Sequence, residues 1–550
     1  MSKGAMGYNM AGGTNNMLKS GHSSHEGLDE AILRNIEAAK QLAVMVSSSM
    51  GPNGMNKLVV NHLNKIIVSS DCATLLKEFE VQHPAATMLS LASQMQDQEF
   101  GDGTNFVIAF AGELLKLAEE LLHEGLHTSE IVSGYKTALD VTLSTIPSLV
   151  CHTVQDPRNP EQLKFAIKSV LMAKQLGYED TLSDLVVKAS LAVMPEGRPA
   201  MKSDSVRIVK LIGGNIEQSE VVHGMLLPRS VEGTITTVNL AKITVFGCGL
   251  ESEGTETQGT VLIRNAEDML NYNKSEEKSL EEVIAAIAAT GTNCVVSGGT
   301  VSEMALHFLE KYKLMCIKVQ SKWDLRRLCA TVGATALVRM GPATPEEMGS
   351  CHKVYMKEYG TKKVTLFEQA GSEDTLVASI VLRSSVVSVI NDLERACEDG
   401  LSTVQHLCKN PNFLPGAGAF EMEMAARLRK LANETDSLDQ YAIRKFGEAF
   451  ETIARVLSVN SGQSSTSLVS SLYAAHSANA TSDGTSPIGP NVGVNIAGGL
   501  VDVTKDGIFD LMVTKESGIR LSVDAALTVL RVDQIIMSKQ AGGPKPPAQR

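Results

Sequence analysis

Hydrophobic residues recur at helical spacing near both ends of this chain, whereas its middle alternates short strands with helices. Near the N-terminus, residues 28–46 place apolar side chains three or four positions apart, and an apolar helix is expected from the loop at 101–104 to about residue 122. The last third returns to this pattern at 421–431, 439–459 and 519–536. The simplest interpretation is a helical domain built from both termini, with other domains inserted into it.

The middle of the chain is predicted to be an α/β region that begins after residue 203. Its expected helices include 280–289 and 302–312, and its expected strands are 206–212, 294–296, 315–319 and 377–382. Within this region, residues 251–279 are polar and include few apolar residues, which a segment that projects from the surface would explain. Nearer the N-terminus, a strand pair at 57–60 and 65–69 and a helix at 85–96 are expected.

Length and composition exclude several classes of protein. The chain has 550 residues, which predicts about three or four folding units, and a formal charge of −12, which argues against nucleic acid as the main partner. No apolar run approaches the ~20 residues that span a bilayer. Residues 1–26 lack an apolar core and are expected to be a mobile tail, not a signal peptide. The 9 cysteines are scattered singly, which favours reduced thiols in a cytosolic protein.

The first candidate site is the loop Gly101-Asp102-Gly103-Thr104-Asn105, which is predicted to open the helix that follows it. Its two glycines allow the backbone to approach a ligand closely, and the N–H groups of the helix start favour an anion. Asp102 is a hard oxygen ligand of the type that Mg²⁺ accepts when it bridges phosphates. The sequence lacks the G-x-x-x-x-G-K-S/T motif, so a nucleotide site here is not a P-loop.

Other turns of this kind add to the set. The segment 415–419 (PGAGA) again leads into a predicted helix, which tight packing of small residues also explains, and 50–52 (MGP) ends the first helix. Asp71 and Asp399 stand near turns or helix ends. Hydrolysis of a phosphoanhydride needs a metal ion to neutralise the phosphates and a carboxylate to orient water. The chain has acidic residues for both tasks, although spacing alone does not bring them together.

One motif suggests a different class of protein. Residues 123–127 (HEGLH) fit H-E-x-x-H, the pattern of zinc peptidases. However, Gly125 weakens a helix where both histidines must be held rigidly, and no third ligand is evident downstream. The alternative interpretation is the end of an apolar helix.

Taken in order, these segments resemble the group II chaperonins from about residue 28 to 536. The matching segments are 50–55 (MGPNGM), 71–78 (DCATLLKE), 83–86 (HPAA), 101–104 (GDGT), 415–419 (PGAGA) and 460–462 (NSG). Within that family, 321–329 (SKWDLRRLC) and 101–106 (GDGTNF) look like one branch of the eukaryotic cytosolic ring, CCT or TRiC. The order of so many segments makes the resemblance specific.

The resemblance implies a multidomain α and α/β fold. The mainly helical equatorial ATP-binding domain would comprise 1–149 and 405–550, and the small intermediate hinge domain 150–218 and 371–404. The apical substrate-binding domain, with an α/β fold, would comprise 219–370. The polar segment at about 251–280 would be a helical lid protrusion that closes over a central cavity.

The resemblance also implies a role for individual residues. Asp102 would bind Mg²⁺, and Asp71 and Asp399 would position the attacking water. Because Asp399 would lie on the intermediate domain, catalysis would require that domain to swing down. Lys174 would sense the γ-phosphate, and Asp510 would bind the ribose. The remaining nucleotide-binding residues would be Met50, Gly51, Pro52, Gly103, Thr104, Asn105, Phe106, Gly416, Ala417 and Gly418.

Cofactors and partners follow from the same resemblance. The cofactors would be ATP or ADP and Mg²⁺, with K⁺ as a further candidate. The partners would be other CCT/TRiC subunits in a hetero-oligomeric, eight-membered double ring in the cytoplasm, a prefoldin-type co-chaperone, and unfolded clients such as actin and tubulin. Nucleic acid and membranes are not expected.

Several positions depart from the family pattern. Asn105 stands where most relatives have Thr, Ala417 where many have Gly, and Leu511 where a Pro usually follows the ribose aspartate. Asn53 and Asn56 replace the usual Lys and Asp. The leading hypothesis is therefore an ATPase with a mechanical output, and the alternative is a ring subunit that binds nucleotide, hydrolyses it weakly and serves as scaffold and client contact.

Overall fold

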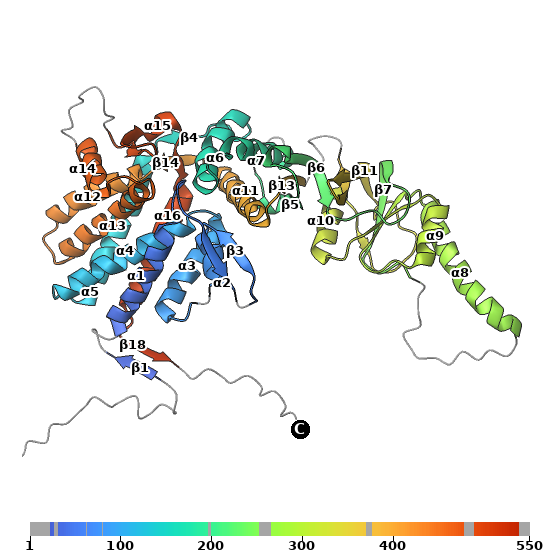
Figure 1. The fold of residues 1–550 in the computed structure, drawn as a ribbon, viewed down its shortest axis with the longest axis horizontal. Coiled ribbons are helices and arrows are strands. Elements are labelled where there is room, and N and C mark those ends of the chain that lie inside the picture. The colour runs from blue at the N-terminus through green and yellow to red at the C-terminus, as the bar shows by residue number, and fades with distance from the viewer. Residues whose placement is uncertain are drawn as a thin grey trace, which may run out of the picture. The chain divides into compact units, whose positions relative to one another are not determined.

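The computed structural model of the chain describes residues 23–26, 31–61, 63–79, 81–195, 200–251, 266–369, 377–477 and 489–537 (Figure 1). The chain forms two compact units. The first comprises Met1–Thr153 and Asn412–Arg550, so both ends of the chain build it, and the second comprises Val154–Pro411. The division into three domains made from the sequence remains a prediction.

The first unit is mainly helical. Its N-terminal elements are β1 (Ser23–Glu26), α1 (Leu33–Ser47), β2 (Lys57–Val60), β3 (Ile66–Ser69), α2 (Cys72–Glu78), α3 (Pro84–Phe100), α4 (Thr104–His123), α5 (Thr128–Thr145) and β4 (His152–Thr153). Its C-terminal elements are β14 (Asn412–Pro415), α12 (Ala419–Glu434), α13 (Asp439–Asn460), α14 (Ser465–His476), β15 (Val492–Val494), β16 (Leu500–Asp502), α15 (Val503–Asp506), β17 (Phe509–Leu511), α16 (Met512–Leu530) and β18 (Gln534–Met537). The strands form small sheets, among them β17-β14-β4, β2-β3 and β1-β18.

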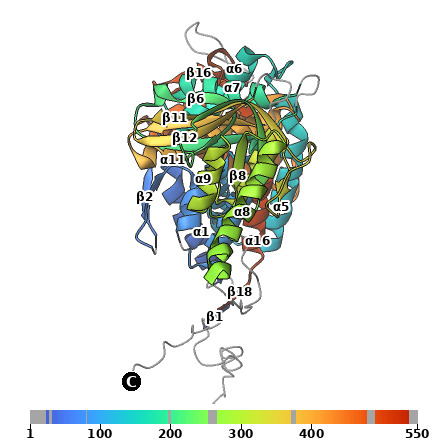
Figure 2. The ribbon, with the colours of Figure 1, turned by 90° about the vertical axis from the view of Figure 1, so that its right-hand side faces the viewer.

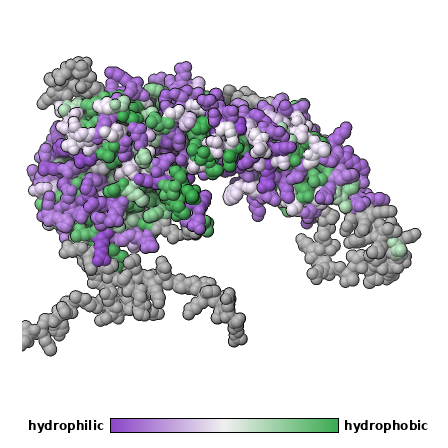
Figure 3. Space-filling model, viewed as in Figure 1, coloured by the Kyte–Doolittle hydropathy of each residue, from purple (hydrophilic) through white to green (hydrophobic). Residues whose placement is uncertain are grey.

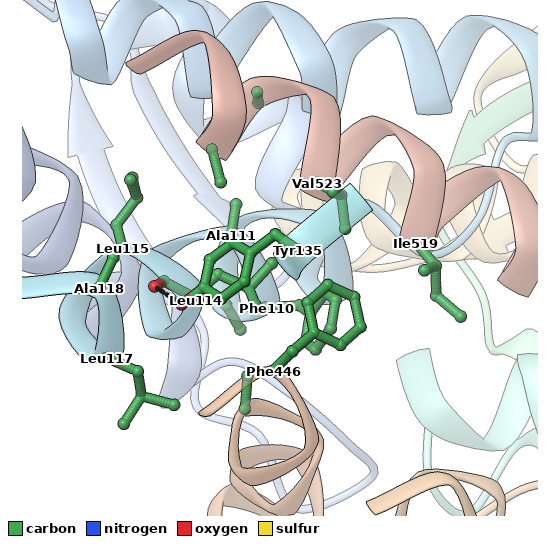
Figure 4. Packing of buried hydrophobic residues seen from close by; sticks show 14 of the residues in the cluster. Phe110, Ala111, Leu114, Leu115, Leu117, Ala118, Tyr135, Phe446, Ile519 and Val523 are labelled. Atoms are coloured by element: carbon green, nitrogen blue, oxygen red, sulfur yellow. Dashed lines mark hydrogen bonds between the residues drawn. The ribbon is translucent and has the colours of Figure 1, made fainter. Parts of the chain in front are cut away.

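Helix α4 is the centre of this unit and packs against α1, α13 and α16. Its sequence is apolar around most of its circumference, which is typical of a buried helix. Gly112 lets α1 approach closely, because a Cβ atom there would lie 2.2 Å from the Cβ atom of Ala43. Phe110, Tyr135 and Phe446 pack together beside α16 (Figure 4), and the Tyr135 hydroxyl donates a hydrogen bond to the Leu114 carbonyl at 2.9 Å.

Phe110 provides a stability prediction for this core. Its side chain is fully buried, and its ring centroid lies 4.6 Å from that of Phe450 and 5.8 Å from that of Phe446. We expect Phe110→Ala to lower the free energy of unfolding by about 3–5 kcal/mol, because it leaves a cavity beside two rings of α13. Urea denaturation measures this, with the exposed Leu91→Ala on α3 as control. A loss below ~1 kcal/mol, as expected of a surface site, would contradict this account of the core.

The second unit is an α/β body. Its helices are α6 (Pro160–Lys174), α7 (Glu179–Val193), α8 (Ala266–Ala289), α9 (Glu303–Lys311), α10 (Lys322–Val332) and α11 (Val387–Leu407). Its strands are β5 (Val206–Ile212), β6 (Glu220–Leu227), β7 (Thr237–Phe246), β8 (Cys294–Ser297), β9 (Met315–Lys318), β10 (Ala336–Leu337), β11 (Gly349–Tyr359), β12 (Lys362–Glu368) and β13 (Ala378–Ser384). They form one 9-stranded sheet in the order β5-β13-β6-β12-β11-β7-β8-β9, with β10 beside β7.

Alternation along the parallel strands β7, β8 and β9 explains how helices cover both faces of the sheet. Val295 faces a cluster with Leu280 and Ile284 of α8, whereas Val296 faces a cluster with Leu328 of α10. Helices α8 and α9 lie side by side (Figures 1 and 2) and share the first of these clusters. Leu309 of α9 belongs to the same cluster.

The structure corrects three expectations at element ends. Helix α8 begins at Ala266, not at 280, so residues 266–279 are helical, whereas 252–265 of the predicted lid lie outside the described residues. The last helix ends at Leu530, and Gln534–Met537 form β18. The tail expected at 1–26 contains β1 at Ser23–Glu26, which pairs with β18 in an antiparallel ladder.

Candidate nucleotide site

The loop between α3 and α4 is shaped by its glycines and held by Gln96. Gly101 ends α3 with φ 78°, and Gly103 precedes α4 with φ 84°, a left-handed conformation that favours glycine. The buried Gln96 amide donates hydrogen bonds to the carbonyls of Asp102 at 3.0 Å and Thr514 at 3.1 Å. The candidate metal ligand therefore lies on a loop that is tied to the start of α16.

Asp71 is fixed directly beside this loop. One of its carboxylate oxygens accepts a hydrogen bond from the Thr104 hydroxyl at 2.9 Å, and the other accepts from the backbone N–H and the hydroxyl of Thr74 at 3.0 and 2.8 Å. Asp71 thereby caps the N-terminus of α2, and only 6% of the residue is exposed. The structure brings a candidate catalytic acid and the candidate phosphate loop together.

Asn105 connects three segments through its side chain. Its amide nitrogen donates to the carbonyls of Ser49 at 3.2 Å and Ser70 at 3.1 Å, and its amide oxygen accepts from the N–H of Cys72 at 2.9 Å. Both amide N–H groups are thus used within the protein. The prediction that Asn105 faces the phosphates therefore depends on its backbone.

The segment Met50, Gly51 and Pro52 lies next to Ser49 and is held from α13. The Asn460 amide donates hydrogen bonds to the carbonyls of Met50 at 2.8 Å and Ser47 at 3.1 Å. Gly51 has φ 82°, and a Cβ atom there would lie 2.6 Å from a methyl group of Leu457. This turn needs glycine for both its conformation and its packing.

The second Gly-rich loop precedes α12 and lies beside Asp510. Gly416 donates its N–H to the Ile508 carbonyl at 3.0 Å, and β14 pairs with β17 so that Leu414 is opposite Asp510. Gly418 has φ 81° and Ala417 has φ 52°. A left-handed alanine costs roughly 1–2 kcal/mol relative to its ordinary conformation, so this loop is strained where many chaperonins have glycine.

Lys515 links the two Gly-rich loops. Its ammonium nitrogen lies 2.9 Å from a carboxylate oxygen of Asp510, 2.5 Å from one of Glu421 in the first turn of α12, and 4.5 Å from the ring centroid of Phe106 in the first turn of α4. Elements far apart in the sequence therefore meet in the first unit, and with them most of the predicted nucleotide-binding residues.

Lys174 and Asp399 lie together in the second unit. Lys174 is the last residue of α6, Asp399 lies within α11, and the ammonium nitrogen is 3.2 Å from a carboxylate oxygen. The two side chains are 12% and 9% exposed. The structure brings these two predicted residues together, and the other predicted site residues belong to the first unit.

The H-E-x-x-H segment does not form a helical metal site. His123 is the last residue of α4, Gly125 has φ 96°, and His127 caps the start of α5 by accepting a hydrogen bond from the N–H of Ser129. The two histidines are thus not one turn apart on a single helix, as the zinc peptidase pattern requires. Across the described residues, no group of three or more His, Cys, Asp or Glu could hold a metal ion.

Comparison with known proteins places this geometry in a family. The TCP-1/cpn60 chaperonin family profile matches residues 42–540. The chain belongs to this chaperonin family. It is 46% identical to the chicken protein named T-complex protein 1 subunit theta, over 97% of this chain and 96% of that protein. The proteins of the same name from Dictyostelium discoideum and Arabidopsis thaliana are 44% and 42% identical over 97% of this chain. The matched regions cover 98% and 96% of those proteins.

These matches confirm the resemblance to group II chaperonins and the chaperonin fold class. They also confirm the branch inferred from the sequence, because the matched relatives are named T-complex protein 1 subunit theta. The nine cysteines of this chaperonin all lie within the described residues and form no disulfide bond. None of the described helices is long and apolar enough to cross a membrane.

The donor set of the first unit fits a magnesium nucleotide. Helices α4 and α12 both begin at a glycine-containing loop, and N–H groups at a helix start bind anions. Asp102 offers a carboxylate, and Mg²⁺ usually takes only one or two protein carboxylates, with phosphate oxygens and water as its other ligands. When bound, Mg²⁺ would neutralise phosphate charge.

The sequence did not reveal the residues that hold this chaperonin site together. Gln96, Lys515 and Glu421 are polar residues within helices, and a helical pattern assigns such residues to the solvent face. Glu421 and Gln96 are nevertheless fully buried. The available signal was their position, since Glu421 and Lys515 each lie within five residues of a predicted nucleotide-binding residue.

Proposed function

We propose that this chaperonin chain is an ATP-hydrolysing subunit of a hetero-oligomeric, eight-membered double ring that encloses unfolded polypeptides in the cytoplasm. Hydrolysis is coupled to closure of a lid. The observation that carries the proposal is the junction of Asp71, Thr104 and Asn105, which joins the Asp102 loop, the Met50 turn and the start of α2. A carboxylate, a glycine loop and a helix N-terminus at one place are the features expected of a site for phosphate and metal.

The first unit binds and orients the nucleotide in this proposal. The phosphates are held by N–H groups of 103–106, the Thr104 hydroxyl donates to Asp71 beside them, and Asp102 binds Mg²⁺. The Met50 turn lines the pocket, Gly416, Ala417 and Gly418 lie against ribose and base, and Asp510 accepts from ribose hydroxyls. Because the loops are fixed by internal hydrogen bonds, binding costs little reorganisation.

Two carboxylates orient the attacking water. Both oxygens of Asp71 accept hydrogen bonds from the protein, which fixes the plane of the carboxylate. Asp399 performs the same task from the second unit, and the cation of Lys174 beside it responds to the γ-phosphate. These assignments come from the family resemblance, and the Lys174–Asp399 ion pair, whose side chains are 12% and 9% exposed, supports them.

The hairpin of β2 and β3 supports assembly with other subunits. Leu58, Val60 and Ile66 are 63%, 55% and 65% exposed, and Figure 3 shows hydrophobic residues over this region of the first unit. A two-stranded ribbon with exposed apolar side chains is weakly stable alone and presents open edges. Partner subunits of the ring cover it in this proposal, while unfolded clients such as actin and tubulin, and a prefoldin-type co-chaperone, are taken from the family.

A second candidate function is a nucleotide-binding scaffold with weak hydrolysis. Two observations favour it: the Asn105 amide has no N–H group left for a phosphate, and Ala417 holds a strained conformation. Either feature can lower nucleotide affinity or turnover without removing the fold. The intact acids Asp71, Asp102 and Asp399 favour the hydrolysing subunit.

Lid closure provides the test of this function. We expect trypsin to cut the assembled protein near Arg264 or Lys274 without nucleotide, and much more slowly with a transition-state analogue of ATP hydrolysis, because closure packs the lid segments of neighbouring subunits together. The helices of the first unit serve as the resistant control. Deleting 252–278 should leave hydrolysis intact, since no proposed ligand lies there. Equal cleavage in both nucleotide states would exclude the lid role.

A further inference from the structure

A buried ammonium group lies between two carboxylates at the edge of the candidate nucleotide site. Lys515 is in the first turn of α16, and its side chain is 12% exposed. Its nitrogen is 2.9 Å from an Asp510 oxygen and 2.5 Å from a Glu421 oxygen. The Glu421 side chain is fully buried, whereas that of Asp510 is 40% exposed. The lysine thus has one partner on the protein side and one on the solvent side.

Glu421 and Lys515 depend on each other. Burial raises the pKa of Glu421, and the Lys515 charge opposes that shift. Burial alone lowers the pKa of Lys515, but the charges of Asp510 and Glu421 raise that pKa by more. The net pKa lies above its ordinary value, so the lysine remains charged. Among the described residues, the Glu421 carboxylate has no hydrogen-bond partner besides this ion pair. Removing one member of such a pair leaves a buried charge without compensation.

Lys515 also joins three elements that carry or directly follow predicted nucleotide-binding residues. Asp510 belongs to β17, Glu421 to α12, and Phe106, whose ring lies under the ammonium group, to α4. The nitrogen has three N–H bonds, donates one of them to Asp510 and forms an ion pair with Glu421. A side chain in this arrangement restricts where the Asp510 carboxylate can lie.

We propose that Lys515 is a positioning residue that orients Asp510 toward the ribose hydroxyls of the nucleotide, with Glu421 anchoring Lys515 from behind. The inference rests on the proposed function, because it takes Asp510 as the ribose ligand. One Asp510 oxygen is held by the lysine, and the other accepts from a hydroxyl. The ribose contact then depends on Lys515, although Lys515 does not touch the nucleotide.

The test compares ATP with 2′,3′-dideoxy-ATP, which lacks both ribose hydroxyls. In the purified assembly, with the sites of the other subunits made unable to bind nucleotide, we expect the parent to prefer ATP by about tenfold or more, as for a hydrogen bond to a charged group. Asp510→Asn should lower this preference. Lys515→Met should remove most of it while changing the affinity for dideoxy-ATP little. Lys505→Met, an exposed lysine on α15, should behave as the parent.

The outcomes separate this inference from the proposed function. A Lys515→Met protein that keeps the parent's preference for ATP would overturn the positioning role, as would a variant that weakens both nucleotides equally. A parent that binds both nucleotides equally would remove the ribose contact and the inference with it. A parent that binds neither would contradict the proposed function itself. If Lys515→Met does not fold, the double variant Lys515→Met/Glu421→Gln, which removes both charges of the anchor, answers the same question.

Discussion

Asp399→Ala should slow ATP hydrolysis by ~10²-fold or more while leaving nucleotide affinity nearly unchanged, because it removes a group that orients the attacking water and not one that binds the nucleotide. In a mixed ring the other subunits would conceal this loss. The measurement therefore needs an assembly in which this chain carries the only active site, with ATP affinity and turnover measured on the same preparation.

The same helix offers a matched control for Asp399. Asp392 also lies in α11, is 9% exposed, and pairs with Arg395 at 3.0 Å. Asp392→Ala removes a comparable carboxylate outside the proposed site, so it should leave turnover near the parent value. Unchanged turnover in Asp399→Ala would remove Asp399 from the mechanism, and an equal loss in both variants would point to damage to α11.

Asp102→Ala should weaken ATP binding by on the order of tenfold or more when Mg²⁺ is present, as expected for loss of a charged ligand. Titration with ATP in the presence and absence of Mg²⁺ measures this effect. The loss should largely disappear without Mg²⁺, since Asp102 acts through the metal ion. The exposed Asp97→Ala at the end of α3 is the control.

A different pattern would refute the assignment of Asp102. Equal ATP affinity in variant and parent with Mg²⁺ present would show that Asp102 is not a metal ligand. A loss of the same size without Mg²⁺ would instead indicate a change in loop shape, because the Asp102 carbonyl accepts a hydrogen bond from Gln96.

The sequence predicted the elements that bury apolar side chains in the core of their own unit. Strand β5 was expected at 206–212 and spans Val206–Ile212, and α13 was expected at 439–459 and spans Asp439–Asn460. Both carry apolar residues at the regular spacing of their element. Apolar residues that alternate along a strand or recur at helical spacing indicate which side chains are buried. Such elements can therefore be predicted from a single sequence.

The missed element ends have a physical reason. Residues 266–279 belong to α8 but are mostly polar in sequence, whereas Leu280 and Ile284 belong to the cluster where α8 packs on the sheet. Strand β18 was assigned to a helix because its pairing partner, β1, lies about 500 residues earlier in the chain. Hydrophobic spacing contains no information on a partner so distant.

At the candidate site, too, local patterns could be predicted and contacts between distant residues could not. Its glycine loops and acids were visible as motifs, whereas the contacts that join them were not. Asn105 was predicted to bind the nucleotide, but its side chain bonds to backbone groups of Ser49, Ser70 and Cys72. Those partners lie more than thirty residues away in sequence, so only the fold reveals that this amide is already used.

The claim that this chain hydrolyses ATP is tested most directly by a single-turnover measurement at its own site. The assembly is prepared with the sites of all other subunits silenced, loaded with ATP and Mg²⁺, and quenched at intervals to measure the fraction of bound ATP converted to ADP. We predict that one ATP per chain binds and is converted to ADP almost completely. Stoichiometric binding of ATP that remains unconverted would contradict the account and support the nucleotide-binding scaffold instead.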